Sequence, residues 1–144
     1  MFKKLSNIGD SGIVCDFGEE VNEKVNNEVI KLFHFIKQKS LDGTIQGIRD
    51  YNPSYNKLII SFDLKVTNSK NVFNFLNSID FTKLEDSRKG KSWEIPICYD
   101  FSLDLENISK ILKISKNEII KIPSETKFFV YMIGFIPGHP FMGD

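Results

Sequence analysis

Residues 46–62 read QGIRDYNPSYNKLIISF and contain the clearest signal of the fold. Residues 46–51 and 57–62 are each typical of a short strand. The segment NPSYN between them, residues 52–56, is rich in residues that favour a sharp reversal of the chain. The sequence therefore predicts a β-hairpin at this point.

A similar unit is expected before this hairpin. Residues 2–8 and 11–17 read as strands, and Gly9 and Asp10 between them suit a tight turn. An amphipathic helix follows, because apolar residues recur at steps of three and four, at Val21, Val25, Val29, Leu32, Phe33 and Ile36. We expect Gly43 to end this helix.

A second helix is expected after the 46–62 hairpin. Asn68 or Ser69 can cap it, and one face carries Val72, Leu76 and Ile79. The resulting order, ββαββα, predicts an α+β fold in which helices cover one face of a sheet in a two-layer sandwich. Residues 1–90 satisfy one such domain, and the polar segment 85–92 is the best candidate for a linker.

The remaining residues, 91–144, are expected to begin a second domain. Residues 93–99 read as a strand, and Pro96 suggests an edge position. Residues 127–135 read as a strongly apolar strand, which needs partners on both edges and a covered face. We therefore expect that either the chain is truncated or a docking partner completes this sheet.

Two short helices are expected between these strands. The first carries Leu105, Ile108, Ile111 and Leu112 on one face. Ser115 with Glu118 matches a capping box, which starts the second. Pro123 is expected to end or kink that helix, because proline lacks a backbone N–H.

The composition and charge of the chain argue against several classes of function. Hydrophobic residues make up 41% and charged residues 26%, which is typical of a globular protein. Lysine plus arginine and aspartate plus glutamate both number 19, and no basic stretch stands out, so little electrostatic footprint for nucleic acid is left and we expect no nucleic-acid partner. No apolar run suits a signal peptide or a membrane span, so we expect a cytoplasmic protein without membrane contact. Cys15 and Cys98 are expected as buried thiols, and no metal site is visible.

Four sequence blocks carry a family resemblance. They are GDSGIVCDFG (9–18), PSYNKLIISFD (53–63), WEIPICYD (93–100) and YMIGFIPGHPFMGD (131–144). As an ordered set, they resemble the allophanate hydrolase subunit 1 family, which includes KipI and the B subunit of 5-oxoprolinase. The resemblance implies that a cyclophilin-like β-barrel of the carboxyltransferase type follows the amino-terminal domain and that residues 91–144 begin it.

The resemblance also implies a function. The B subunit of 5-oxoprolinase works with two partners, a second carboxyltransferase-like protein (the C subunit) and a lactam-utilisation protein (the A subunit). Together they hydrolyse 5-oxoproline to glutamate using ATP. Such a chain is a hydrolase component that is inactive alone, and no ATP site is assigned to it. The alternatives are a KipI-like inhibitor of a sporulation histidine kinase, or the carboxyltransferase part of urea carboxylase or allophanate hydrolase. Biotin is the expected carrier only under the urea carboxylase alternative.

The sequence departs from the family pattern at several positions. Asn56 and Lys57 stand where the family usually has arginine and serine, so an anion contact that depends on that arginine would be lost. Pro123 and Ser124 stand where many members have a histidine after the last helix, in a segment that resembles Ile-His-Ser. His139 replaces a common phenylalanine, giving GHPF where GFPY is usual.

The candidate site is the loop 134–143, which suits a substrate-lining or subunit-docking role. Its candidate residues are Gly134, Phe135, Pro137, Gly138, His139, Pro140, Phe141 and Gly143. A barrel turn shaped only for packing is the alternative. His139 can serve in hydrogen bonding or proton transfer, or simply fill a phenylalanine position. Glu94 and Pro96 are candidates for a strand facing the cleft, although Glu94 equally suits a solvent-facing position. No catalytic residue is assigned.

Overall fold

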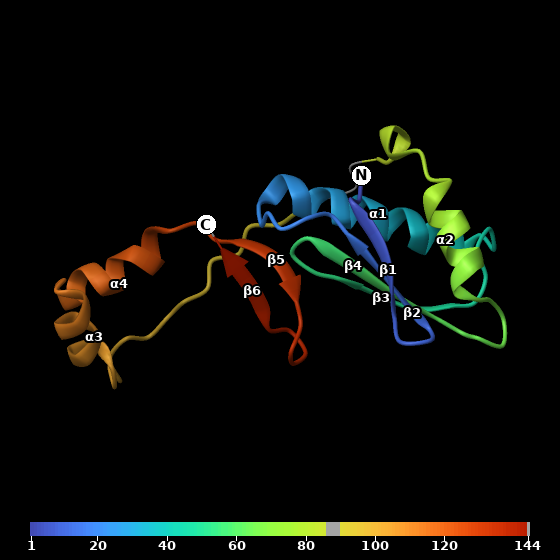
Figure 1. Ribbon diagram of the computed structural model, residues 1–144. Helices are drawn as coiled ribbons and strands as arrows, with labels where there is room; N and C mark the ends of the chain where they lie inside the picture. Colours follow the sequence, from blue (N-terminus) through green and yellow to red (C-terminus); the bar gives the residue numbers. More distant parts are fainter. Residues whose placement is uncertain (86–89, 144) are drawn as a thin grey trace. The chain divides into compact units, whose positions relative to one another are not determined.

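The computed structural model describes residues 1–85 and 90–143. Its elements follow one another in the order shown in Figure 1: β1 (Lys4–Ile8), β2 (Gly12–Asp16), α1 (Glu23–Leu41), β3 (Ile48–Pro53), β4 (Lys57–Phe62), α2 (Ser69–Asn77), the 3-10 turn η1 (Phe81–Lys83), α3 (Leu105–Leu112), α4 (Lys116–Glu125), β5 (Phe129–Ile133) and β6 (Pro140–Gly143). The predicted ββαββα order is confirmed for the amino-terminal part.

The first four strands form one antiparallel sheet in the order β1-β2-β4-β3. Val14 of β2 faces Ile59 of β4, and Tyr51 of β3 faces Ile60. The two central strands, β2 and β4, therefore come from different hairpins. Their pairing joins the two ββα segments in one sheet. The edge strand β3 contains a register shift between Ile48 and Asp50, and such irregularities discourage pairing with further strands.

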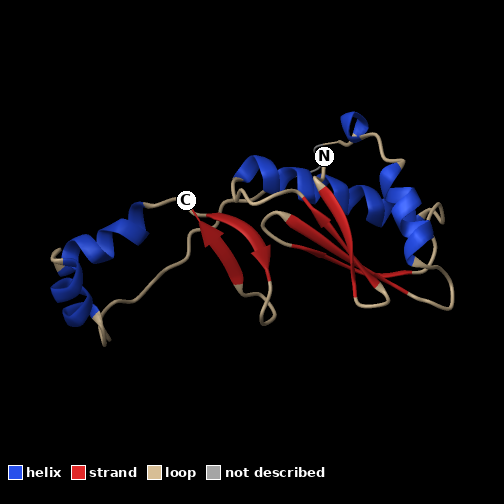
Figure 2. Cartoon of the chain, in the orientation of Figure 1, coloured by secondary structure: helices blue, strands red, loops and turns tan. Residues whose placement is uncertain are grey.

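The core lies between this sheet and the helices α1 and α2 (Figure 2). Side chains alternate along β4, so that Leu58, Ile60 and Phe62 are buried while Lys57, Ile59 and Ser61 point to the other face. The helices contribute fully or almost fully buried residues at helical spacing, namely Val29, Leu32, Ile36, Val72 and Leu76. The two-layer α+β sandwich is thus held by apolar burial on one face of the sheet.

The helix ends follow local chemistry. The side chains of Asn22 and Asn68 each accept a hydrogen bond from a backbone N–H in the first turn of α1 and α2. Gly43 follows the end of α1 with a φ of +79°, a left-handed conformation that glycine adopts without strain. Val21 lies before α1 and is exposed, so its predicted place in the helix is wrong.

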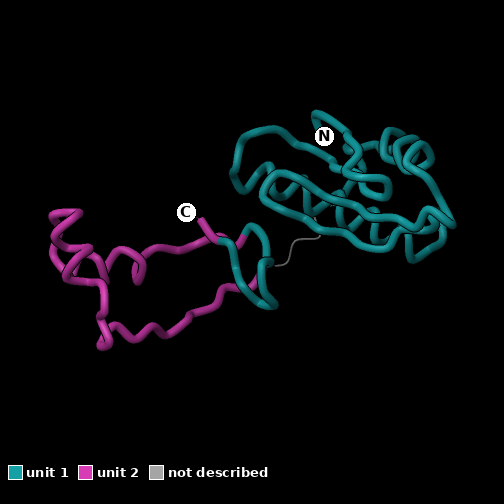
Figure 3. Tube along the Cα trace, turned by 60° about the horizontal axis from the view of Figure 1, so that its bottom comes forward, with its two compact units in different colours: residues 1–89, 131–141 teal, residues 90–130, 142–144 magenta. Residues whose placement is uncertain are grey.

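By its contacts the chain divides into two compact units (Figure 3). Unit 1 contains residues 1–89 and 131–141, and unit 2 contains residues 90–130 and 142–144. The predicted linker 85–92 falls partly on residues outside those described. The predicted domain boundary near residue 90 and the β-barrel remain predictions.

Unit 2 carries the helices α3 and α4 at the predicted positions. Ser115 and Glu118 form the expected capping box at the start of α4. Pro123 lies inside α4, and the helix continues to Glu125 before it ends. None of the described helices is long and apolar enough to cross a membrane.

The strand predicted for residues 93–99 is wrong, because residues 90–99 belong to no regular element. An apolar segment becomes a strand only when a neighbouring strand supplies hydrogen-bond partners, and the described strands pair elsewhere. Cys98 is consequently exposed, so its predicted burial is wrong, whereas Cys15 is buried as expected. Burial raises the pKa of the Cys15 thiol to about 12, so that it stays protonated.

Candidate functional site

Residues 134–139 form the connection of a hairpin made by β5 and β6. The backbone N–H of Gly134 donates to the His139 carbonyl at 3.1 Å, and the His139 N–H donates to the Ile136 carbonyl at 3.2 Å. The predicted loop 134–143 is therefore shorter in the structure, since Pro140, Phe141 and Gly143 lie in β6. The other candidate residues, Gly134, Phe135, Pro137, Gly138 and His139, lie in the connection.

Two residues of this connection have a left-handed backbone. Gly138 has a φ of +81°, and no heavy atom lies within 4 Å of the position a β-carbon would take, so glycine is favoured for its conformation rather than for lack of space. Phe135 has a φ of +68°, which is uncommon for a residue other than glycine. Its side chain is 90% exposed. Backbone strain of this kind is concentrated at binding sites.

His139 lies between two aromatic rings. Its ring centroid is 6.2 Å from that of Phe135 and 5.1 Å from that of Phe141, both in edge-to-face geometry. In residues 1–85 and 90–143 no acidic side chain forms an ion pair with His139; Asp144 lies outside the described residues. The exposed imidazole can donate a hydrogen bond to a group bound at the connection 134–139, or accept one from it.

The β5–β6 hairpin contacts the turn between β3 and β4 through aromatic side chains. The Tyr55 ring centroid lies 5.3 Å from that of Tyr131 and 6.4 Å from that of Phe141. Tyr55 belongs to the sequence block 53–63, and the other two residues belong to the block 131–144. Two sequence blocks that are far apart in the chain thus meet within unit 1.

Asn26 of α1 joins the same contact from inside the core and was not predicted as a site residue. Its side-chain nitrogen donates to the backbone carbonyls of Ser54 at 2.9 Å, Tyr55 at 3.0 Å and Tyr131 at 3.2 Å. Asn26 is fully buried. Its position, three residues before Val29 on the buried stripe of α1, is the sequence signal that could have revealed it, since a polar residue there needs partners.

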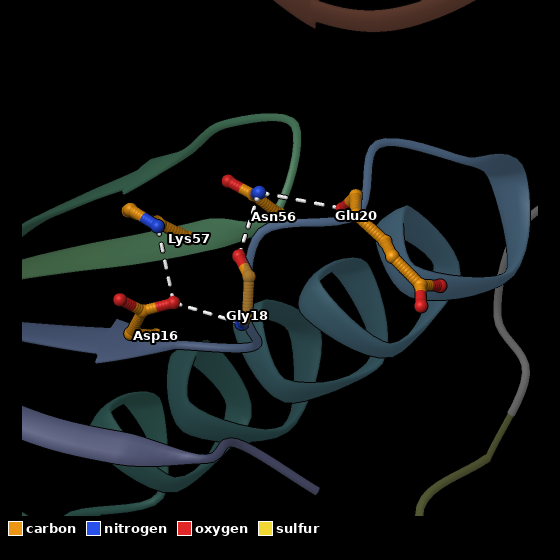
Figure 4. A network of polar contacts seen from close by, with 5 residues as sticks. All are labelled: Asp16, Gly18, Glu20, Asn56 and Lys57. Carbon is orange, nitrogen blue, oxygen red and sulfur yellow. Dashed lines mark hydrogen bonds and ion pairs between the residues drawn. The ribbon is translucent and has the colours of Figure 1, made fainter.

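Asn56 and Lys57, which depart from the family pattern, take part in a group of polar contacts with Asp16, Gly18 and Glu20, shown in Figure 4. We call this group the polar corner. The Asn56 side-chain nitrogen donates to the carbonyls of Gly18 at 2.8 Å and Glu20 at 3.3 Å. Lys57 pairs with Asp16 at 3.0 Å, and the Gly18 N–H donates to the same carboxylate at 2.8 Å. These contacts, the Gly18 hydrogen bond first, hold the pKa of Asp16 below its ordinary value. Both residues are thus engaged within the protein.

A shallow, open depression of about 400 Å³ lies beside this corner, lined by Lys3, Lys4, Asp16, Gly18, Glu19 and Glu20. Ammonium and carboxylate groups are mixed around it, so it favours neither anionic nor cationic ligands strongly. The other predicted candidates, Glu94 and Pro96, are exposed in the segment that forms no strand. Their cleft role therefore has no strand to support it and stays a prediction.

The connection 134–139 does not have the features of a phosphate-binding loop. The glycine-containing connection 134–139 leads into a strand rather than a helix N-terminus, and it contains no lysine. Among residues 1–85 and 90–143, no group of three or more His, Cys, Asp or Glu side chains is arranged to hold a metal ion.

Comparisons with known proteins identify relatives along nearly the whole chain. The B subunit of 5-oxoprolinase from Bacillus subtilis (strain 168) is 29% identical over 153 residues, an alignment that covers 97% of this chain and 62% of the relative. This chain therefore spans less than two thirds of that relative's length.

Solved structures are also similar to this chain over most of its length. The crystal structure of TTHA0988 matches with a TM-score of 0.74 and 26% identity, over 92% of this chain and 25% of that one. Kluyveromyces lactis urea carboxylase matches with a TM-score of 0.62 and 17% identity, over 90% of this chain and 13% of that one, which shows a shared fold.

The sequence profile of one family, described as carboxyltransferase domain, subdomain C and D, matches residues 3–144. The resemblance carried by the four sequence blocks is thereby confirmed. This chain belongs to the carboxyltransferase domain, subdomain C and D, family.

Proposed function

We propose that the protein is the B subunit of an ATP-dependent 5-oxoprolinase complex, which opens the ring of 5-oxoproline to give glutamate. The observation that carries the proposal is the similarity to the B subunit of 5-oxoprolinase from Bacillus subtilis (strain 168), 29% identical over 97% of this chain. Support for the candidate loop comes from the packing of the β5–β6 hairpin on the β3–β4 turn through Tyr55, Tyr131 and Phe141. It joins two of the family's sequence blocks around one exposed loop.

The chemistry explains why such a complex needs several subunits. The carbonyl of a lactam is a poor electrophile because amide resonance stabilises it, and ATP supplies the activation that makes attack by water feasible. The connection 134–139 lacks the features of a phosphate-binding loop, and in this proposal the rest of the complex carries out the ATP-dependent step. The partners in this proposal are two further subunits, one carboxyltransferase-like and one for lactam utilisation, all in the cytoplasm.

The part of this chain in the reaction is to present the connection 134–139 to the substrate. Phe135 offers an exposed apolar ring, and His139 offers a hydrogen-bonding group 6.2 Å away, measured between ring centroids. A small cyclic amide carries an apolar ring edge and polar amide and carboxylate groups, which match these two features. The chain acts as one wall of a shared site and is inactive alone.

The test is release of glutamate from 5-oxoproline by the natural full-length protein purified with its two partner subunits. We expect glutamate to appear only when ATP and all three proteins are present. Omitting this protein should abolish the activity, and adding it back should restore it.

The same preparation separates this proposal from its rivals. Absence of glutamate release, together with tight binding to a histidine kinase, would replace the proposal with a KipI-like regulator. Turnover of urea or allophanate in place of 5-oxoproline would keep the enzyme complex and change its substrate.

A further inference from the structure

The Asn26 side chain is buried at a position that an apolar residue could occupy. Asn26 and Val29 are both 0% exposed, one turn apart on the face of α1 that packs on the sheet. A buried amide adds stability only when its hydrogen bonds are satisfied, and otherwise it costs free energy. Asn26 therefore contributes a directional contact that a larger apolar core could not provide.

The amide nitrogen of Asn26 serves more acceptors than it has hydrogens. An amide nitrogen carries two hydrogens, whereas the carbonyls of Ser54, Tyr55 and Tyr131 lie at 2.9, 3.0 and 3.2 Å. Three carbonyls therefore converge on one side-chain nitrogen. Such an arrangement ties three peptide groups to a single buried side chain.

These peptide groups belong to two elements that are far apart in the sequence and adjoin different sheets. Ser54 and Tyr55 form part of the β3–β4 turn, whereas Tyr131 lies in β5, 105 residues after Asn26. Among the described strands, β5 pairs with β6, and the four-stranded sheet is separate. The side-chain amide of Asn26 hydrogen-bonds to both elements inside unit 1.

These contacts continue into the exposed connection through aromatic rings. Tyr55 contacts both Tyr131 and Phe141, and Phe141 contacts His139 with ring centroids 5.1 Å apart. The path therefore runs from a buried amide through two rings to the imidazole at the candidate site. A shift of β5 relative to the turn would move both strands of the hairpin that carry the connection 134–139.

We propose that Asn26 is a positioning residue, which sets the orientation of the connection 134–139 by hydrogen-bonding the β3–β4 turn and β5 at once. Its effect on 5-oxoproline binding rests on the proposed function. Its effect on the hairpin itself does not depend on that function. Asn26 touches no substrate and acts through Tyr55, Tyr131 and Phe141.

Three variants of the natural full-length protein test the proposal. Asn26→Ala removes the donor, and Val29→Ala is the matched control, because it truncates a fully buried neighbour on the same helix to the same residue. Asn26→Asp keeps the shape but places a carboxylate against carbonyl oxygens, so that attraction becomes repulsion.

Hydrogen exchange is the first measurement. Asn26→Ala and Asn26→Asp should lower the protection of amides in residues 131–141 by about tenfold or more relative to amides of β2 and β4, the change expected when buried hydrogen bonds are lost. Val29→Ala should lower protection throughout unit 1 without this preference. An even loss in all three variants would show that Asn26 is only a core residue and would overturn the inference.

Kinetics in the assembled complex are the second measurement. Asn26→Ala should raise the KM for 5-oxoproline several-fold more than it lowers kcat, whereas Val29→Ala should leave KM unchanged. Equal KM values in the two variants would overturn the role in substrate positioning. If the wild-type complex releases no glutamate, the proposed function fails, and the exchange comparison still decides whether Asn26 orients the hairpin.

Tyr55→Ala covers the case in which neither Asn26 variant folds. Tyr55 is only partly buried, and its ring joins Tyr131 and Phe141. Its removal leaves the Asn26 hydrogen bonds to the backbone carbonyls in place and tests the aromatic part of the path. Protection in residues 131–141 should fall selectively, and unchanged protection there would overturn the role of the Tyr55 ring in orienting the hairpin.

Discussion

Asp16 ends β2 at a corner where its carboxylate meets the Lys57 ammonium and the Gly18 N–H. Because these contacts favour the charged form, the pKa of Asp16 is lower in the folded protein than the ordinary 3.8. A lowered carboxyl pKa adds stability above the unfolded value, and that stability is lost as the pH falls through the folded value. The sign of the effect is thus destabilisation by acid.

We predict that Asp16→Asn destabilises the protein near neutral pH by at most about 1 kcal/mol, since the pair is partly exposed. The difference from wild type should shrink as the pH falls below 3.8. Urea unfolding across this pH range measures it, with Asp10→Asn in the β1–β2 turn as the control for loss of one negative charge. A difference that grows at low pH would contradict the assignment.

At the scale of elements, α4 depends on its own first turn. The Ser115 hydroxyl accepts from the Glu118 N–H at 3.2 Å, and the Glu118 carboxylate accepts from the Ser115 N–H at 2.8 Å. No side chain of α4 among the described residues is buried. Local hydrogen bonds therefore contribute more to this helix than core packing does.

We predict that Ser115→Ala costs α4 about 0.5–2 kcal/mol, because it removes the capping hydroxyl. The measurement is hydrogen exchange of amides in residues 117–120, with Lys121→Ala in the middle of the helix as the control. Faster exchange confined to α4 is expected. Unchanged exchange would mean that packing, rather than the cap, holds the helix.

At the scale of the molecule, stability resides in the core of unit 1. Leu32 is 0% exposed between α1 and the sheet, whereas Leu112 at the end of α3 is 57% exposed. Removing a buried side chain leaves a cavity and loses apolar burial, whereas an exposed side chain loses little.

We predict that Leu32→Ala destabilises unit 1 by about 2–5 kcal/mol. Leu112→Ala should change stability by roughly 0.5 kcal/mol or less. Chemical denaturation followed by circular dichroism compares the two. Similar losses in both variants would show that unit 2 buries Leu112 against a surface absent from the described contacts.

Local sequence patterns predict most helices and strands of the amino-terminal part correctly. The helix stripe through Val29 and Leu32, the asparagine cap at Asn68 and the turn at Gly9 are all determined by residues close together in the sequence. The capping box of α4 was predicted for the same reason. Residues 93–99 show the limit of this reasoning, since strand formation needs a partner that can come from anywhere in the chain.

Local spacing and ordered blocks of residues are enough to predict the ββαββα order, the apolar face of most elements and the family. The β1-β2-β4-β3 strand order and the meeting of Asn26, Tyr55 and Tyr131 emerge only from the folded chain. A hydrogen bond between residues 105 positions apart depends on how the chain folds back on itself, which local spacing does not encode.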